Sequence, residues 1–220
     1  MYKKRIKNES KQKTVVDWND SLQQLDCHPS EQQLTQLHDY LSLLQRWNKV
    51  YNLTAVRDPN DMLALHLFDS LAVAQHIQGE NCLDVGSGAG LPGIPLAIMQ
   101  PERQFTLLDT NGKKTRFIQQ AIIELGLSNA KVVQTRVETW QPDKKFDAII
   151  SRAFASIRDF VDSSLQHLQE KGCLYAMKGQ WIESEWQALP DSVLIKKVHP
   201  LTIPNLHAER HLIEVHARTD

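Results

Sequence analysis

The sequence has few cysteines and no long hydrophobic run, and both shortages narrow what the chain can be. Its three cysteines are odd in number and show no Cys-x-x-Cys spacing, which excludes a disulfide framework and disfavours a zinc site. No apolar run approaches the roughly 18 residues of a membrane span, and no apolar segment follows the basic N-terminus, as it would in a secretory signal. We therefore expect a cytoplasmic protein without a bound metal.

An excess of charge of either sign is also absent. The chain has 25 Lys and Arg against 26 Asp and Glu, a net charge of −1, so it does not coat nucleic acid through bulk charge. Residues 1–16 are the exception, with six basic residues against Glu9 alone, a local charge of +5. This segment is either a mobile basic arm on a mildly acidic body or a solubilising extension.

Residues 17–79 have the residue spacing of helices. Ser30 opens a capping box before leucines that recur every three or four residues, and we expect this helix to end near Trp47. A second helix is expected from Asp58, with Gly79 closing it. This part of the chain is too small for a core of its own, so we predict a helical cap.

Residues 80–220 alternate strands with helices instead. Strands are predicted at residues 82–85, 105–108, 131–133, 146–150, 173–177, 192–199 and 210–217. Helices predicted over 113–125 and 157–168 lie between them, which indicates a mainly parallel sheet covered on both faces. The segment 200–209 is too short for a long helix, so the last strand should run antiparallel. The predicted fold is α/β, a seven-stranded, Rossmann-like sheet that forms one structural unit with the cap.

A glycine-rich string follows the first predicted strand and has two interpretations beyond a plain turn. Gly88-x-Gly90-x-x-Gly93 fits a dinucleotide fingerprint. Asp84-x-Gly86-x-Gly88-x-Gly90 is similar to the cofactor loop of class I S-adenosylmethionine-dependent methyltransferases. The second is favoured, because the Asp84 carboxylate would repel a pyrophosphate but accept hydrogen bonds around the cationic methionine moiety. Two prolines after the loop would also interrupt the long helix of a pyrophosphate site.

Two further acids complete an ordered set at the ends of successive strands. Asp109 ends the second strand and would bind the two ribose hydroxyls, and Glu138 follows the third and would accept from the adenine amine. Ligands in such folds bind beyond the carboxyl ends of the strands. Alone, Asp109 is also typical of a helix cap and Glu138 of a solvent-facing residue, but with the glycines they predict one cofactor site.

The residues after the fourth strand bear on the substrate. Methylating a cytosine carbon needs a cysteine nucleophile, but the cysteines fall in predicted strands or in the cap, and the Asn/Asp-Pro-Pro-aromatic motif of adenine enzymes is absent. Arg152 and Phe154 stand there instead. An arginine can bind O6 and N7 of guanine, and an aromatic ring can stack on its face. The plainer interpretations are a surface salt bridge for Arg152 and core packing for Phe154.

A specific resemblance joins these motifs. In order, the chain carries Trp47-Asn48-Lys49-x-x-Asn52-Leu53-Thr54, His66-x-x-Asp69-Ser70, the glycine string, Leu108-Asp109, Phe146-Asp147, Ser151-Arg152-Ala153-Phe154 and Met177-Lys178-Gly179. From about Leu34 to Val215 the sequence resembles the ribosomal RNA small subunit methyltransferase G family, also called glucose-inhibited division protein B. The segment 1–16 lies outside that pattern.

The resemblance implies an activity, a donor and a substrate. The family is bacterial and cytoplasmic, and it transfers a methyl group from S-adenosylmethionine to N7 of one guanine in 16S rRNA, at position 527 in the 530 loop. The family's cofactor contacts match here at Gly86, Leu91, Val137, Glu138 and Arg152. The implied partner is 16S rRNA, either naked, in an assembly intermediate or in the small ribosomal subunit. We expect a monomer.

Residues outside the cofactor edge are candidates for RNA binding and catalysis. The candidate RNA contacts are Arg57, Lys113, Arg116, Phe154, Lys178 and Arg210, and Lys114 belongs to the same expected basic rim. Arg152 is the candidate catalytic residue, which would orient the base, and His66 and Asp69 either take part or pair locally.

Two rival functions stay open. An NAD-dependent oxidoreductase would suit Gly88-x-Gly90-x-x-Gly93 but lacks a Tyr-x-x-x-Lys proton donor. The other rival is a ribosome-binding module with a vestigial cofactor site, and the complete set of acids disfavours it.

Overall fold

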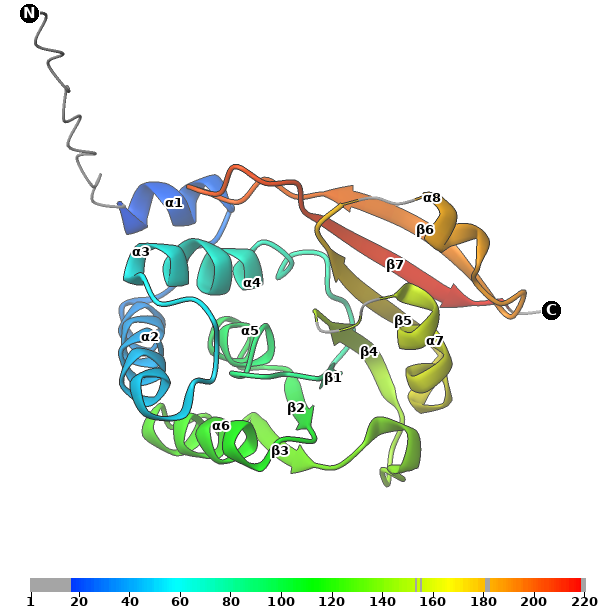
Figure 1. The fold of residues 1–220 in the computed structure, drawn as a ribbon, viewed down its shortest axis with the longest axis horizontal. Helices are drawn as coiled ribbons and strands as arrows, with labels where there is room; N and C mark the ends of the chain where they lie inside the picture. The colour runs from blue at the N-terminus through cyan, green and yellow to red at the C-terminus, as the bar shows by residue number, and fades with distance from the viewer. Residues whose placement is uncertain (1–16, 153, 155, 181–182, 219–220) are drawn as a thin grey trace, which may run out of the picture.

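A computed structural model describes residues 17–152, 154, 156–180 and 183–218; the predicted basic arm over 1–16 lies outside them. Seven strands form one sheet in the order β3-β2-β1-β4-β5-β7-β6 (Figure 1). They are β1 (Asn81–Val85), β2 (Gln104–Asp109), β3 (Ala130–Gln134), β4 (Phe146–Ser151), β5 (Leu168–Lys178), β6 (Val193–Pro200) and β7 (His211–Ala217). β1 to β5 pair in parallel, and β7 runs antiparallel to both β5 and β6. The predicted α/β fold with an antiparallel last strand is confirmed.

The direction of β7 follows from the length of the chain before it. β6 ends at Pro200 and β7 begins at His211, and a parallel neighbour would need a longer crossover connection, usually a helix. β5 begins earlier than predicted, at Leu168, because α7 (Ile157–Ser164) and a short 3₁₀ turn end before it. The predicted helix end at residue 168 and strand start at residue 173 are therefore wrong. Gly172 lies within the strand, where a Cβ atom would come within 2.8 Å of the Asp147 carbonyl oxygen.

The cap consists of α1 (Trp18–Gln24), α2 (Glu31–Tyr51), α3 (Pro59–Met62), the π-helical segment η1 (Leu63–Phe68) and α4 (Asp69–Leu71). The capping box of α2 forms as predicted: the Ser30 Oγ accepts from the Gln33 N–H, and the Gln33 side chain accepts from the Ser30 N–H. The predicted end near Trp47 is wrong. Asn48 is buried and bonds through its side chain to the backbone of Thr54 and Val56, so it holds the loop after the helix rather than ending the helix.

The second cap helix changes geometry along its length. It begins after Asp58 as predicted, but it passes through η1 and ends at Leu71, so Gly79 does not close it. Gly79 instead forms the turn into β1 with φ +97°, where a Cβ atom would meet the Asp147 side chain. π-helical segments are rare and occur often at functional sites, and η1 carries His66.

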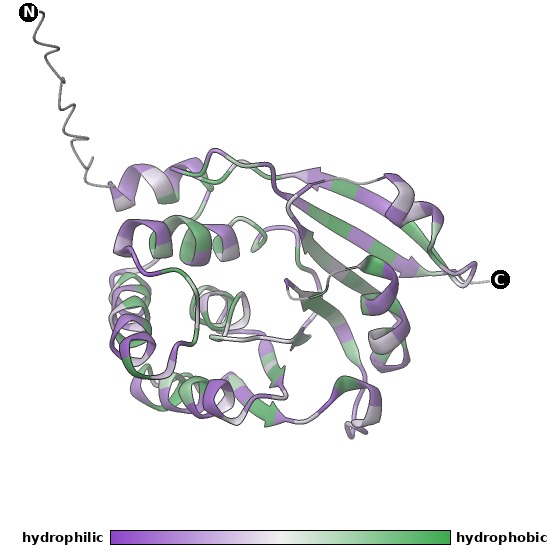
Figure 2. Cartoon of the chain, viewed as in Figure 1, coloured by the Kyte–Doolittle hydropathy of each residue, from purple (hydrophilic) through white to green (hydrophobic). Residues whose placement is uncertain are grey.

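The sheet buries a hydrophobic cluster on each face. Alternate residues of β5 show this division: Cys173 and Tyr175 pack with the cap, α5 (Gly93–Met99) and α6 (Gly112–Glu124), whereas Leu174 packs with Phe160 of α7. Figure 1 shows the cap, α5 and α6 gathered on one side, with α7 and the short α8 (Glu183–Gln187) on the other. The strands carry green, hydrophobic residues where these helices cover them (Figure 2).

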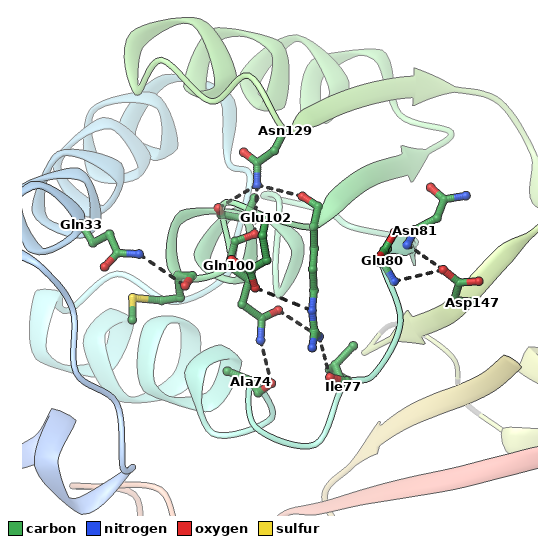
Figure 3. A network of polar contacts seen from close by, with 12 residues as sticks. Gln33, Ala74, Ile77, Glu80, Asn81, Gln100, Glu102, Asn129 and Asp147 are labelled. Atoms are coloured by element: carbon green, nitrogen blue, oxygen red, sulfur yellow. Dashed lines mark hydrogen bonds and ion pairs between the residues drawn. The ribbon is translucent and has the colours of Figure 1, made fainter.

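Side-chain amides tie the cap to α5 and its C-terminal end, and tie that end to the residue before β3 (Figure 3). The Gln33 amide donates to the Ile98 carbonyl at 3.0 Å, and the Gln100 amide donates to the Ala74 carbonyl at 2.8 Å. The Asn129 amide donates to three carbonyls at the end of α5 and in the loop after it. The division into a cap and a methyltransferase domain stays a prediction, and these bonds join the two parts. Across the described residues, none of the helices is both long and apolar enough to cross a membrane.

Candidate active site

The glycine string forms the loop between β1 and α5. Gly86, Gly88 and Gly90 have φ values of +70°, +58° and +80°, in the left-handed region that other residues rarely adopt. The loop borders a cavity of about 210 Å³ beyond the carboxyl ends of β1 and β4, which we call the first cavity. Its lining is Leu53, Thr54, His66, Gly86, Ser87, Gly88, Ala89, Leu91, Lys114 and Arg152. The loop, the cap and the residue after β4 therefore enclose one site.

Asp84 lies beneath this loop and does not line the cavity. Its Oδ2 accepts from the Gly93 N–H at 2.9 Å, which fixes the start of α5, and its Oδ1 has no partner among the described residues. Burial raises the pKa of the carboxyl to about 7, and the bond from Gly93 opposes that rise. The predicted direct contact of Asp84 with a cofactor stays a prediction, since the observed bonds are to the loop.

Asp109 ends β2 and connects two loops of the site. Its Oδ2 accepts from the Gly88 N–H at 2.8 Å, and its Oδ1 accepts from the Asn111 N–H at 2.8 Å. The carboxylate is buried, and each oxygen can accept a further hydrogen bond through its second lone pair. Asp109 thus supports the glycine loop through Gly88 but is outside the lining of the first cavity, and its predicted contact with the ribose stays a prediction.

The third predicted position follows β3 in a 3₁₀ turn, η2 (Val137–Thr139). Val137 is buried, and its carbonyl accepts from His167 Nε2 at 2.7 Å, while the Glu138 side chain is exposed. Because β3, β2 and β1 are consecutive in the sheet, the three predicted acids occupy neighbouring strand ends. Val137 and Glu138 are not among the residues that line the first cavity.

Arg152 stands between the first cavity and a second one of about 400 Å³. Its Nη1 donates to the Leu65 carbonyl at 2.9 Å and to the Asp69 Oδ2 at 3.2 Å. Asp69 Oδ1 accepts from Arg210 Nε at 3.0 Å. The second cavity is lined by Val56, Leu65, His66, Asp69, Arg152, Met177, Lys178, Gly179, Leu201, Arg210 and His211. Arg152 thus forms a salt bridge, as its plainer interpretation predicts. That salt bridge is also part of a cavity wall.

His66 shares this wall with Arg152. Its Nε2 lies 2.9 Å from the Thr54 Oγ1, and its Nδ1 has no hydrogen-bond partner among the described residues. Burial, with help from the positive charge of Arg152, lowers the pKa of His66 to about 4. The imidazole is therefore neutral at physiological pH, and it is a polar but uncharged part of both cavities.

The predicted RNA contacts divide into two groups. Lys178 and Arg210 join Arg152 in the second cavity, where Lys178 pairs with Glu185 at 3.1 Å. The structure leaves the others outside it: Arg57 bonds to the end of α2, Lys113 and Arg116 are exposed on α6, and Phe154 packs 5.3 Å from the Phe160 ring. The packing of Phe154 matches its plainer interpretation.

Sequence reasoning missed several features of the site. Lys114 was expected on the basic rim but lines the first cavity, and Thr54 and Leu53 reach that cavity from the cap. Asp69 does not pair locally with His66 but bonds to two distant arginines. The available signal was the pair of cap motifs around Thr54 and Asp69, which carried the family resemblance but no assigned role.

A group of metal-ligand side chains lies away from both cavities, on β5 and β7. Ligand atoms of Cys173, Glu214 and His216 all lie within 4.8 Å of one another in the described part of the chain. Glu214 is already bonded to His199 at 2.6 Å, and the positive charge of Lys196 acts on both Cys173 and His216. That charge opposes a cation at this position.

Comparison with known proteins assigns the chain to a family. A family model described as rRNA small subunit methyltransferase G matches residues 33–213. The chain belongs to this family. It is 53% identical over 196 residues to Ribosomal RNA small subunit methyltransferase G of Photobacterium profundum, covering 89% of this chain and 95% of that protein. The protein of the same name from Haemophilus influenzae is 50% identical over 192 residues, covering 87% and 95%.

Solved structures share the fold of this methyltransferase G family member. A SAM dependent methyltransferase from Aquifex aeolicus has a TM-score of 0.56 at 19% identity, covering 72% of this chain and 93% of that chain. A SAM-dependent methyltransferase from Thiobacillus denitrificans, in complex with S-adenosyl-L-homocysteine, has a TM-score of 0.53 at 11% identity, covering 80% and 98%. Family and fold together confirm the predicted class I fold and the prediction of a methyltransferase that uses S-adenosylmethionine.

Proposed function

We propose that the protein transfers a methyl group from S-adenosylmethionine to N7 of the guanine at position 527, in the 530 loop of 16S rRNA. One observation carries the proposal: His66 and Arg152 line both cavities, so a donor in the first and a base in the second would meet across a shared wall. The names of the relatives support the substrate class. We further propose that the protein acts in the cytoplasm, as a monomer, on rRNA of the small subunit or of its assembly intermediate.

The backbone of the glycine loop leaves space in the first cavity for the methyl donor. A Cβ atom on Gly88 would lie 3.9 Å from the Lys114 Nζ, at the cavity wall, so the glycine leaves space that a side chain would fill. Gly86, Leu91 and Asp109 would hold the donor there, with Val137 and Glu138 at the far strand end. S-adenosylmethionine supplies the methyl group on a positively charged sulfur. The unpartnered Oδ1 of Asp84 gives the site a buried acceptor beneath the loop.

The charge and donors of the second cavity suit guanine. Arg152, Lys178 and Arg210 stand against Asp69 and Glu185, and His66 is neutral, so the wall is net positive. The major-groove edge of guanine offers only acceptors, O6 and N7. A guanidinium that binds O6 leaves N7 free to face the first cavity. Because N7 carries a lone pair and no proton, the protein needs to orient the base and has no proton to remove.

Our first prediction is that methyl transfer needs neither a cysteine nucleophile nor a general base. Burial raises the pKa of Cys27 to about 11 and those of Cys82 and Cys173 to about 12, so none is a thiolate near neutrality. A triple variant, Cys27→Ala, Cys82→Ala and Cys173→Ala, should keep its single-turnover rate within about twofold. The three single variants serve if the triple variant does not fold. An RNA adduct trapped on any of these cysteines would overturn this prediction.

The same mechanism predicts a flat pH profile with saturating donor. Guanine N7 has no proton to remove, so the single-turnover rate should lack the ascending limb that a base titrating between pH 6 and 9 produces. His66, with a pKa lowered to about 4, stays neutral over this range, so its own titration adds no limb either. The donor must be saturating because the Asp84 carboxyl, with a pKa raised to about 7, gains its charge in this range and can change donor affinity. A tenfold rise in the rate across this range would contradict the mechanism.

Our next prediction concerns the basic segment over residues 1–16, whose charge of +5 is expected to add RNA affinity alone. Deleting residues 1–13 should flatten the dependence of RNA affinity on salt, by up to about 0.7 in the logarithmic slope for each lost phosphate contact. Donor affinity should not change. An unchanged salt slope would mean that the segment is a solubilising extension.

The proposed function is tested with two RNA substrates and two cofactors. Transfer of labelled methyl groups to 16S rRNA should be abolished by replacing the guanine at position 527 with adenine, and transfer to a transcript changed elsewhere should persist. S-adenosylmethionine, and not NAD(H), should raise the melting temperature, because only a ligand of the folded state stabilises it. Equal transfer to both transcripts would refute the assigned position.

A further inference from the structure

Asp69 is a buried carboxylate that bonds to two arginines at once in the second cavity. Its Oδ2 lies 3.2 Å from Arg152 Nη1, and its Oδ1 lies 3.0 Å from Arg210 Nε. The Asp69 side chain is 4% exposed, against 28% for Arg152 and 25% for Arg210. All three residues line the second cavity, but the two guanidinium groups are much more exposed there than the carboxylate that holds them.

The three residues come from separate parts of the chain. Arg152 follows β4, Arg210 precedes β7, and Asp69 begins α4 directly after the π-helical segment η1. The carbonyl of Leu65 within η1 accepts a second bond from Arg152 Nη1 at 2.9 Å. The cap thus positions both arginines of the sheet domain, through one carboxylate and one carbonyl.

The bonds to Asp69 leave donors available on both arginines. Arg152 uses only its Nη1, and Arg210 uses its Nε and Nη1, so the Nη2 group of each has no partner among the described residues. Two guanidinium groups on one side of a cavity would repel each other without a negative charge between them. Removing a shared buried partner leaves such charges uncompensated.

We propose that Asp69 is a positioning residue, which holds Arg152 against the guanine base and Arg210 against the backbone phosphate of the same RNA segment. Arg152 is assigned the base because it also lines the first cavity, next to the methyl donor, whereas Arg210 lines the second cavity alone. The inference rests on the proposed function. Asp69 itself touches neither ligand and acts through the two arginines.

The test is Asp69→Asn, which keeps the shape of the side chain and removes its charge. We expect the KM for 16S rRNA to rise at least tenfold and the single-turnover rate to fall at least tenfold, with the dissociation constant for S-adenosylhomocysteine unchanged within twofold. The matched control is Asp162→Asn, which removes the acid of the half-exposed Arg158–Asp162 pair on α7. It should leave all three values unchanged. A merely structural role would weaken cofactor binding together with RNA binding.

A second measurement covers the case in which Asp69→Asn does not fold. Because Arg152 and Arg210 share one carboxylate, the effects of Arg152→Lys and Arg210→Lys on kcat/KM should not multiply in the double variant, and the deviation should reach at least fivefold. If the effects multiply, or if Asp69→Asn methylates at the full rate of an active wild-type protein, the positioning role is overturned and the proposed function still stands. A wild-type protein that methylates no 16S rRNA would overturn the proposed function and this inference with it.

Discussion

Replacing Arg152 with alanine is expected to lower the single-turnover rate of methyl transfer by at least about 100-fold, the scale of a misplaced reacting group. Arg152 is the one arginine that lines both cavities among the described residues, and its bonds to Leu65 and Asp69 fix its side chain there. Without the Arg152 side chain, the guanine base is no longer held next to the methyl donor. The measurement is a rapid-quench assay with saturating protein and donor.

The matched control is Arg46→Ala. Arg46 is exposed on α2 and pairs with Glu124 at 3.2 Å, and it belongs to neither cavity lining. This variant should keep the wild-type rate. A full-rate Arg152→Ala variant would remove Arg152 from the catalytic account, whatever its effect on stability.

Replacing Asp109 with alanine is expected to weaken the binding of S-adenosylmethionine by roughly 1.5–3 kcal/mol, about 10- to 150-fold in the dissociation constant. The carboxylate would accept from the ribose hydroxyls, and it already holds the Gly88 N–H and the Asn111 N–H at 2.8 Å each. Its loss would therefore remove ligand bonds and also loosen the loop. Isothermal calorimetry measures the change directly.

Two variants separate these effects on donor binding. Asp109→Asn keeps one side-chain carbonyl oxygen as an acceptor, so it should bind the donor with an affinity between those of the wild type and Asp109→Ala. Asp162→Ala, on the surface of α7, should bind as the wild type does. Tight donor binding by Asp109→Ala would rule out the ribose assignment.

The strands of the sheet could be predicted from the sequence because local residue patterns mark them. β1, β2 and β4 are short apolar runs; a glycine follows β1, and an aspartate ends β2. The antiparallel direction of β7 also followed from chain length alone. The errors lie where tertiary contacts decide: the residues after Trp47 lack a helical period, which predicted a helix end there, yet Asn48 lies within α2, is buried and bonds to the loop that follows.

The site was predictable only on the side built by the glycine loop. Gly86, Gly88 and Asp109 lie within one strand–loop–helix–strand unit, so their proximity follows from the fold class. Lys113 and Lys114 are neighbours on α6, and the phase of that helix decides which one faces the first cavity. No period in the sequence relates Asp69 to Arg210, which only the assembled fold brings to 3.0 Å.

Mass spectrometry of nucleosides tests the central claim most directly. 16S rRNA would be incubated with the protein and S-adenosylmethionine carrying a deuterated methyl group, then digested either to nucleosides or to mapped fragments. The proposal predicts one labelled product, 7-methylguanosine, confined to the fragment that contains the 530 loop and formed far more slowly in the Arg152→Ala reaction. A different labelled nucleoside, or labelled 7-methylguanosine in another fragment, would contradict it.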